Sequence, residues 1–168
     1  MTEMTWTTMH IGGALPSNRI DELIERIHED FVQDAQDAPE SEDEVRAVVG
    51  KGESLFLQAH VNYGNPDAVV AFCIENNLTY WLHYDAGPEW DSGIQIWKPD
   101  ASTVPEECPA SAQGYTPVVD LATMRIWEKQ GLTLQHVIDE TARFETDKVP
   151  PLTIVETAAV AQLEEAQS

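Results

Sequence analysis

Two different hydrophobic periods alternate along this chain, and they constrain its fold more than any other feature. Residues 20–31 carry apolar side chains at helical spacing, which predicts one amphipathic helix. Residues 54–61 and 79–84 instead alternate in the way that is typical of strands. Strands combined with well-separated amphipathic helices predict an α+β fold, with a mainly antiparallel sheet and helices packed on one face. The helical stripe consists of Ile20, Leu23, Ile24, Ile27 and Phe31.

The same patterns predict the remaining elements. We expect strands at 5–11, 54–61, 79–84, 94–97, 118–119 and 152–155. We expect helices at 18–33, 65–76, 120–130 and from 133 onward, with a short helix near 41–48. Residues 34–53 otherwise form an acidic loop, and 98–114 an irregular connection. We expect Ser17 or Asn18 to cap the first helix, and Leu121, Met124 and Trp127 to face inward.

The length of 168 residues is typical of one domain, which we expect to span 1–155 and to be followed by a polar tail at 156–168. No segment resembles a secretory leader or a membrane span of about 20 apolar residues. Cys73 and Cys108 are the two cysteines, and we expect them to be reduced thiols. These observations predict a cytoplasmic protein.

The net charge limits which classes of macromolecule this protein is expected to bind. Thirty Asp and Glu oppose nine Lys and Arg, which gives a formal charge of −21. A small domain needs a net charge of only about 2 to 8 in magnitude to stay soluble. Nucleic acid and anionic membranes repel such a protein. Basic proteins, including those that bind DNA or RNA, are therefore the expected partners.

Eleven acids and one base, Arg26, lie between residues 21 and 44. As one helix this segment would span about 36 Å, with one carboxylate per ~3.3 Å. A DNA strand carries one phosphate per about 3.4 Å. Pro39 rules out one straight helix, so this is a comparison of scale. We predict a partner-binding, DNA-mimicking surface, with a solvated acidic face as the alternative. Its residues are Asp21, Glu22, Glu25, Glu29, Asp30, Asp34, Asp37, Glu40, Glu42, Asp43 and Glu44.

In size and charge the chain resembles small acidic proteins that phages and plasmids encode against host restriction or CRISPR systems. The resemblance is one of composition and carries no motif. It implies an inhibitor that occupies the nucleic-acid site of a DNA- or RNA-binding enzyme. A second explanation of the charge is adaptation to high salt, which should spread acids over the whole chain. Residues 54–84 hold only Asp67 and Glu75, so the clustering counts against it.

Five aromatic residues are concentrated between residues 80 and 97. Trp81 points to the opposite face of its strand from Tyr80 and Tyr84. Protein interfaces favour Trp as an anchor, so we name Trp81, Trp90 and Trp97 as candidate contacts with a partner or with a second copy in a homodimer. Packing in the core is the alternative explanation for all three.

The loop at 83–91 is the candidate small-molecule site. Asp85, Glu89 and Asp91 could bind a hard cation, and His83 with Asp85 could form an acid–base pair in a small enzyme. Their spacing does not match an EF-hand, and an ordinary hairpin turn is the alternative. The five histidines lack metal-ligand spacing, and no nucleophile or phosphate-loop motif is present. We therefore predict no cofactor, no metal, no catalytic residue and no enzymatic activity.

Overall fold

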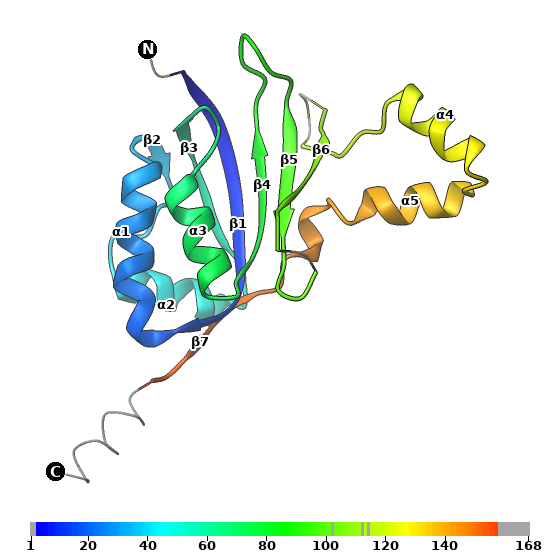
Figure 1. Cartoon of the computed structure of the whole chain (residues 1–168). Helices are drawn as coiled ribbons and strands as arrows, with labels where there is room; N and C mark the ends of the chain where they lie inside the picture. Colours follow the sequence, from blue (N-terminus) through cyan, green and yellow to red (C-terminus); the bar gives the residue numbers. More distant parts are fainter. Residues whose placement is uncertain (1–2, 102, 112, 114, 158–168) are drawn as a thin grey trace, which may run out of the picture.

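The computed structural model describes residues 3–157 apart from 102, 112 and 114 (Figure 1). It confirms the predicted α+β class with a mainly antiparallel sheet. The strands are β1 (Met4–Pro16), β2 (Gln33–Gln36), β3 (Leu55–Asn62), β4 (Thr79–Tyr84), β5 (Gly93–Trp97), β6 (Glu106–Pro109) and β7 (Leu152–Val155). The helices are α1 (Ile20–Asp30), α2 (Glu42–Lys51), α3 (Asp67–Glu75), α4 (Leu121–Lys129) and α5 (Leu134–Ala142), with 3-10 turns at Ser17–Arg19 and Thr146–Lys148.

The long strand β1 organises the sheet. It pairs antiparallel with β3 on one side and with β4 on the other, in the order β2-β3-β1-β4-β5-β6. Beyond these pairings its last four residues, from Gly13 to Pro16, pair in parallel with β7. From residue 149 onward the chain returns to β1, where β7 pairs with it just before the start of α1 (Figure 1).

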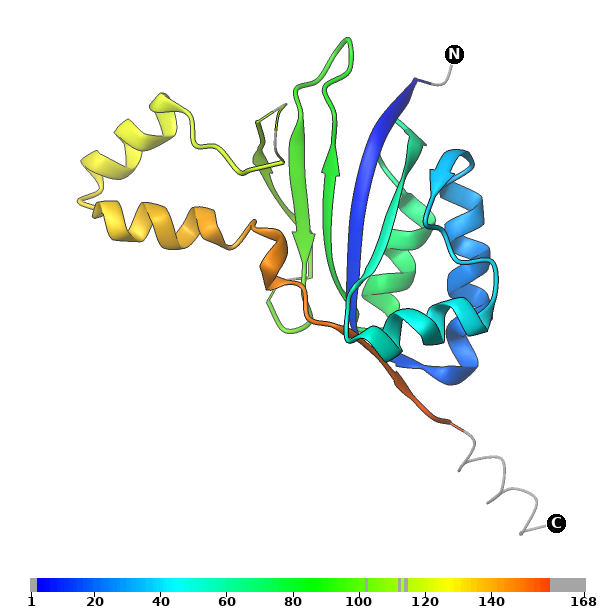
Figure 2. The same cartoon turned by 180° about the vertical axis from the view of Figure 1, so that it is seen from behind.

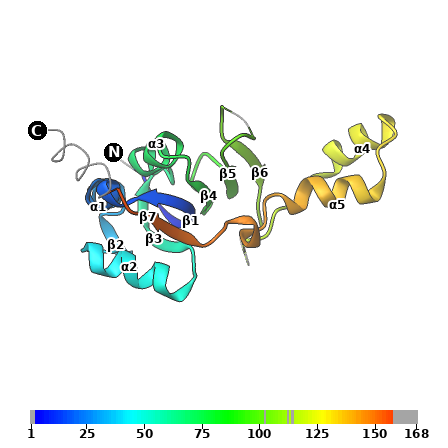
Figure 3. The same cartoon turned by 90° about the horizontal axis from the view of Figure 1, so that it is seen from below.

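The helices α1 and α3 cover one face of the sheet (Figures 1 and 3). The predicted stripe is confirmed, because all five of its residues are buried against β1, β3 and α3. Alternate residues of β1 and β3, such as Met9 and Leu57, complete this core. Helix α2 lies on the other side of the sheet, near its lower end (Figures 2 and 3). No helix within the described residues is long and apolar enough to cross a membrane.

The ends of α1 differ from the prediction. A 3-10 turn precedes the helix, so neither Ser17 nor Asn18 caps it. The Ser17 hydroxyl instead accepts a hydrogen bond from the Thr157 amide at 3.0 Å. At the other end Asp30 Oδ2 accepts the Val69 amide at 2.9 Å and so caps α3. Burial raises the pKa of the Asp30 carboxyl, and the amides of Val69 and Ala68 counteract that rise.

Two edge strands were not predicted. β2 consists of four exposed residues, and β6 replaces part of the expected irregular connection at 98–114. Both strands are polar and lie at the two edges of the sheet, where hydrogen bonds to β3 and β5 rather than a hydrophobic pattern define them. The expected strand at 118–119 is wrong. That region contains only one isolated bridge, between Ala110 and Pro117.

The pair α4 and α5 projects away from the sheet (Figures 1 and 2). The side chains of two residues cap these helices: Asp120 accepts the Thr123 amide and Thr133 accepts the His136 amide. The expectation that Leu121 and Met124 face inward is wrong, because both are exposed. Trp127 is half-buried and lines a pocket, and neither helix has a fully buried residue. Most of the tail expected at 156–168 lies outside the described residues. Glu156 and Thr157 are described, and Glu156 is ion-paired with Arg46 at 2.7 Å.

Candidate functional site

The face of the sheet opposite α1 and α3, which we call the open face, has an unusual composition. The register places alternate residues of β1, β3 and β4 on it, and no described helix crosses its centre (Figure 2). A face that water alone covers normally carries small polar or charged residues. This one carries aromatic and imidazole rings with two uncharged polar side chains. Its residues are Trp6, Thr8, His10, Phe56, Gln58, His60, Trp81 and His83.

The rings of the open face pack across neighbouring strands. His10 lies between Phe56 on β3 and Trp81 on β4, with ring centroids 4.9 Å and 5.7 Å away. The rings of Trp6 and His60 form a similar cross-strand pair at 5.1 Å. Such pairs stabilise the sheet and fix the orientation of each ring. The partly exposed rings of Trp6, His10, Phe56 and His60 therefore form a preorganised aromatic surface, whereas Trp81 and His83 on the same face are buried within the chain.

A row of polar side chains crosses the centre of this surface. Thr8 lies directly opposite Gln58 on one side and His83 on the other. The Thr8 hydroxyl is buried without a hydrogen-bond partner among the described residues, and the His83 ring nitrogens make no hydrogen bond of standard geometry. Burial lowers the pKa of His83, while Asp85 and the Ser111 backbone oppose that shift. Burial therefore favours the uncharged ring, which is fully buried with the Tyr115 ring centroid 4.3 Å away. Thr8 and Gln58 are the members of the row that line the central hollow.

Three hollows lie along the open face and its edges. The central one, of about 480 Å³, lies over Thr8 and Trp81 and is bordered by Tyr115. Phe56 connects it to a second hollow of about 430 Å³ beside α2. A third, of about 440 Å³, lies between Trp6 and the β4–β5 loop. The third hollow shares no lining residue with the other two, but Trp6 and His60 place it on the same face of the sheet.

Carboxylates border these hollows. Among the described residues that line them there are seven acids, and Lys51 is the only Lys or Arg. His10, the imidazole of the central hollow, does little to offset this charge, because burial lowers its pKa. An aromatic floor with an acidic rim fits a basic protein surface. The seven acids are Glu3, Asp37, Glu44, Glu53, Asp85, Glu145 and Asp147.

The structure separates the eleven predicted contact acids into two groups. Asp21, Glu22, Glu25, Glu29 and Asp30 lie on α1, on the covered side of the sheet, whereas the other six follow along β2, its loop and the start of α2. They do not form one continuous row. That these acids contact a partner stays a prediction. The second group comprises Asp34, Asp37, Glu40, Glu42, Asp43 and Glu44.

Several of these acids already have partners within the chain. Arg19 is ion-paired with Glu22 at 2.7 Å, and Arg26 with Glu29 at 3.5 Å. Three others have structural contacts of their own: the Asp30 carboxylate caps α3, Asp34 is 3.0 Å from His60, and Glu42 is 2.7 Å from Arg46. In addition, the Glu44 carboxylate accepts the Glu40 amide at 2.7 Å. On α1 only Asp21 and Glu25 have no such contact among the described residues.

The candidate interface tryptophans have different environments. Trp81 is 1% exposed and its indole donates to the Phe144 carbonyl at 2.7 Å, so the chain's own segment covers it. Trp97 is buried in the core with α1 and α3. Both therefore pack within this chain, and neither presents a free surface to a partner. Trp90 is partly exposed, and its indole donates to the Asp85 carbonyl at 3.2 Å.

The loop at 83–91 is a hairpin turn between β4 and β5, built around Trp90. Gly87 donates its amide to the Trp90 carbonyl at 3.0 Å, and the indole packs directly over Gly87. The loop's three acids do not converge. Within the described residues no group of three His, Cys, Asp or Glu side chains could hold a metal ion. Asp85 Oδ1 is 3.8 Å from His83 Nδ1, beyond hydrogen-bond distance.

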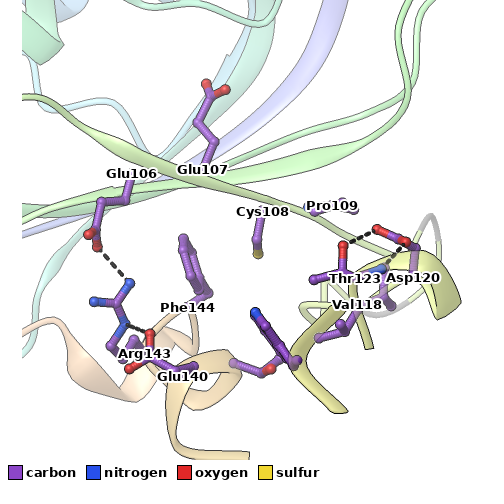
Figure 4. Close-up of a pocket in the computed structure, with 13 residues that line it drawn as sticks. Glu106, Glu107, Cys108, Pro109, Val118, Asp120, Thr123, Glu140, Arg143 and Phe144 are labelled. Atoms are coloured by element: carbon purple, nitrogen blue, oxygen red, sulfur yellow. Dashed lines mark hydrogen bonds and ion pairs between the residues drawn. The ribbon is translucent and has the colours of Figure 1, made fainter. Parts of the chain in front are cut away.

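A separate pocket of about 520 Å³ lies between β6 and the α4–α5 pair (Figure 4). Arg143 crosses its mouth, 2.9 Å from Glu106 and 3.5 Å from Glu140. Burial raises the pKa of the Cys108 thiol to about 11, so this cysteine is not a nucleophile at pH 7. The pocket therefore contains a mixture of charges and no reactive group.

The open face went unrecognised in the sequence, although its signal was present. The residues of β1 and β3 that do not face the core are aromatic, imidazole or uncharged polar ones, where a solvated strand would carry charges. Reading that alternation on both strands together would have indicated a binding surface.

No protein-family model, no curated protein and no solved structure matches this chain.

Proposed function

We propose that this chain is an acidic interaction protein that binds a basic, nucleic-acid-binding enzyme and blocks its nucleic-acid site. It would act in the cytoplasm as an inhibitor of the kind that phages and plasmids direct against restriction or CRISPR systems. The observation that carries the proposal is the acidic rim of the open face, by which we mean the seven carboxylates that line its three hollows. Lys51 is the only Lys or Arg among the described lining residues, and the whole protein has a net charge of −21. A nucleic-acid-binding enzyme has the complementary basic surface.

The open face suits this role better than α1 does. On α1 ion pairs and helix capping engage three of the five acids. On the rim such contacts engage two of the seven, Glu44 with the Glu40 amide and Asp147 with Lys148 at 3.5 Å, so more charge is available to a partner there. On the open face the rim surrounds rings that supply apolar contact area, such as Phe56 and Tyr115. Interfaces combine a desolvated aromatic centre with a polar rim in this way. An Arg or Lys of the partner would enter the central hollow between Tyr115 and the carboxylate of Glu145.

Affinity capture from a host lysate tests the proposal. The whole chain serves as bait, and bound proteins are eluted first at about 50 mM and then at about 500 mM salt. We expect a nucleic-acid-binding enzyme of basic surface to be retained at low salt and released at high salt, because screening weakens charge–charge attraction. A set of partners that is neither basic nor salt-sensitive would contradict the proposal.

A further inference from the structure

The α4–α5 pair is anchored firmly at both of its ends. At its start the Val118 amide donates to the Pro109 carbonyl at 2.9 Å. At its end Phe144 is buried beside Trp81, and Arg143 is ion-paired with Glu106. The two helices between these anchors leave the body of the protein (Figure 1). The two anchors therefore fix the position of a helix pair that projects from the body of the protein.

These helices expose large apolar side chains to water in the monomer. Leu134 is 70% exposed and Leu121 is 60% exposed, and neither helix buries a single residue. Isolated large apolar residues on a surface are ordinary, but here they recur on two adjacent helices. The remaining exposed ones are Met124, Ile126 and Ile138.

Neither helix is long enough to be stable by itself. Each has nine residues, and isolated helices shorter than about 12 to 15 residues are marginal in water. Helices in proteins obtain most of their stability from packing an apolar face. Capping by Asp120 and Thr133 contributes only about 1 kcal/mol each. A partner that covers the apolar side chains would provide the missing packing.

The charge of this region identifies that partner. Residues 118–144 contain four acids and three bases, a net charge of −1, whereas the rest of the chain carries −20. Net repulsion between two copies, each of charge −21, opposes their close approach, and a nearly neutral region opposes it least. Within the pair α4 has a net charge of +1 and α5 a net charge of −2. An isologous dimer can place α4 of one copy against α5 of the other, which joins opposite charges.

We propose that the protein forms a two-fold symmetric homodimer through α4 and α5. The apolar residues of both helices then pack against those of the second copy. The open face lies on a different part of the molecule, so this inference does not depend on the proposed function. A basic partner would gain little at a surface of net charge −1.

Sedimentation equilibrium of the purified full chain tests the dimer. We expect the mass to rise from that of the monomer, 18.7 kDa, to twice that value with increasing concentration. Leu134→Gln combined with Ile138→Gln should raise the dimer dissociation constant more than ~100-fold, because each lost apolar contact occurs twice in a symmetric interface. Matched substitutions outside the helices, Val32→Gln with Val155→Gln, change residues that are similarly exposed and should leave the constant unchanged.

A charge swap between α4 and α5 provides a second test of the dimer, because non-specific hydrophobic association would not respond to it. Arg125→Glu with Lys129→Glu makes α4 negative and should weaken the dimer. Adding Asp139→Lys and Glu140→Lys makes α5 positive and should restore it. A chain that stays monomeric up to about 100 µM, above the micromolar range of weak dimers, overturns the proposal. So does a dimer that the α4 and α5 substitutions leave unchanged.

Discussion

Reversing three acids on the rim of the open face should reduce affinity for the captured enzyme about 100-fold. The substitutions are Glu53→Lys, Glu145→Lys and Asp147→Lys, all at exposed positions. Each should cost about 1 kcal/mol, because a charge that faced the basic partner now repels it. Much of the loss should appear as slower association, which surface plasmon resonance measures directly.

The matched control reverses three acids on α1, Asp21→Lys, Glu25→Lys and Glu29→Lys. Both variants change the net charge from −21 to −15, so they alter the long-range field equally. We expect less than a tenfold loss for the α1 variant, because α1 lies on the covered side of the sheet. The opposite order of effects would place the contact on α1, as the sequence alone suggested. Equal losses would mean that only total charge matters.

Gly12→Ala should be the most destabilising single substitution outside the core. A Cβ at Gly12 would lie 1.7 Å from the Pro150 carbonyl oxygen and 2.8 Å from its carbon. Backbone atoms cannot give way as a flexible side chain can, so residues 149–152 would have to move. That movement disrupts the pairing of β7 with β1 and exposes the buried Leu152. We expect a loss of about 3 kcal/mol in the free energy of unfolding.

Urea denaturation measures this effect, and Gly50→Ala is its control. Gly50 lies in α2, where an added Cβ meets nothing within 4 Å. Alanine is favoured over glycine in a helix by about 0.5 to 1 kcal/mol, so this control should be unchanged or more stable. A Gly12→Ala variant with the wild-type midpoint would show that residues 149–152 do not pack on β1 as described.

Elements with a strong hydrophobic period were predictable from the sequence. The stripe of α1 and the alternation of β3 and β4 were identified because a buried face imposes that pattern locally. The edge strand β2 was not, since its sequence QDAQ has no apolar residue of strand type and only pairing with β3 defines it. The α4–α5 pair shows the opposite error. Its amphipathic pattern predicted burial, yet in the described part of the chain neither helix has a buried residue.

The candidate site could be predicted only in part, because charge is a property of composition and a surface is a property of the fold. The excess of acids pointed to a basic partner. Which acids are free depended on ion pairs with Arg19, Arg26 and Arg46, which the linear sequence does not reveal. Likewise, the fate of Trp81 depended on Phe144, a residue 63 positions away that covers it.

Competition with the nucleic acid that the captured enzyme binds tests the central claim most directly. The captured enzyme, once purified, is titrated with this protein at several fixed concentrations of its own nucleic acid. If the acidic rim occupies the nucleic-acid site, the apparent dissociation constant should rise in proportion to the nucleic acid present, and no ternary complex should form. An affinity that stays constant while a ternary complex accumulates would contradict the account.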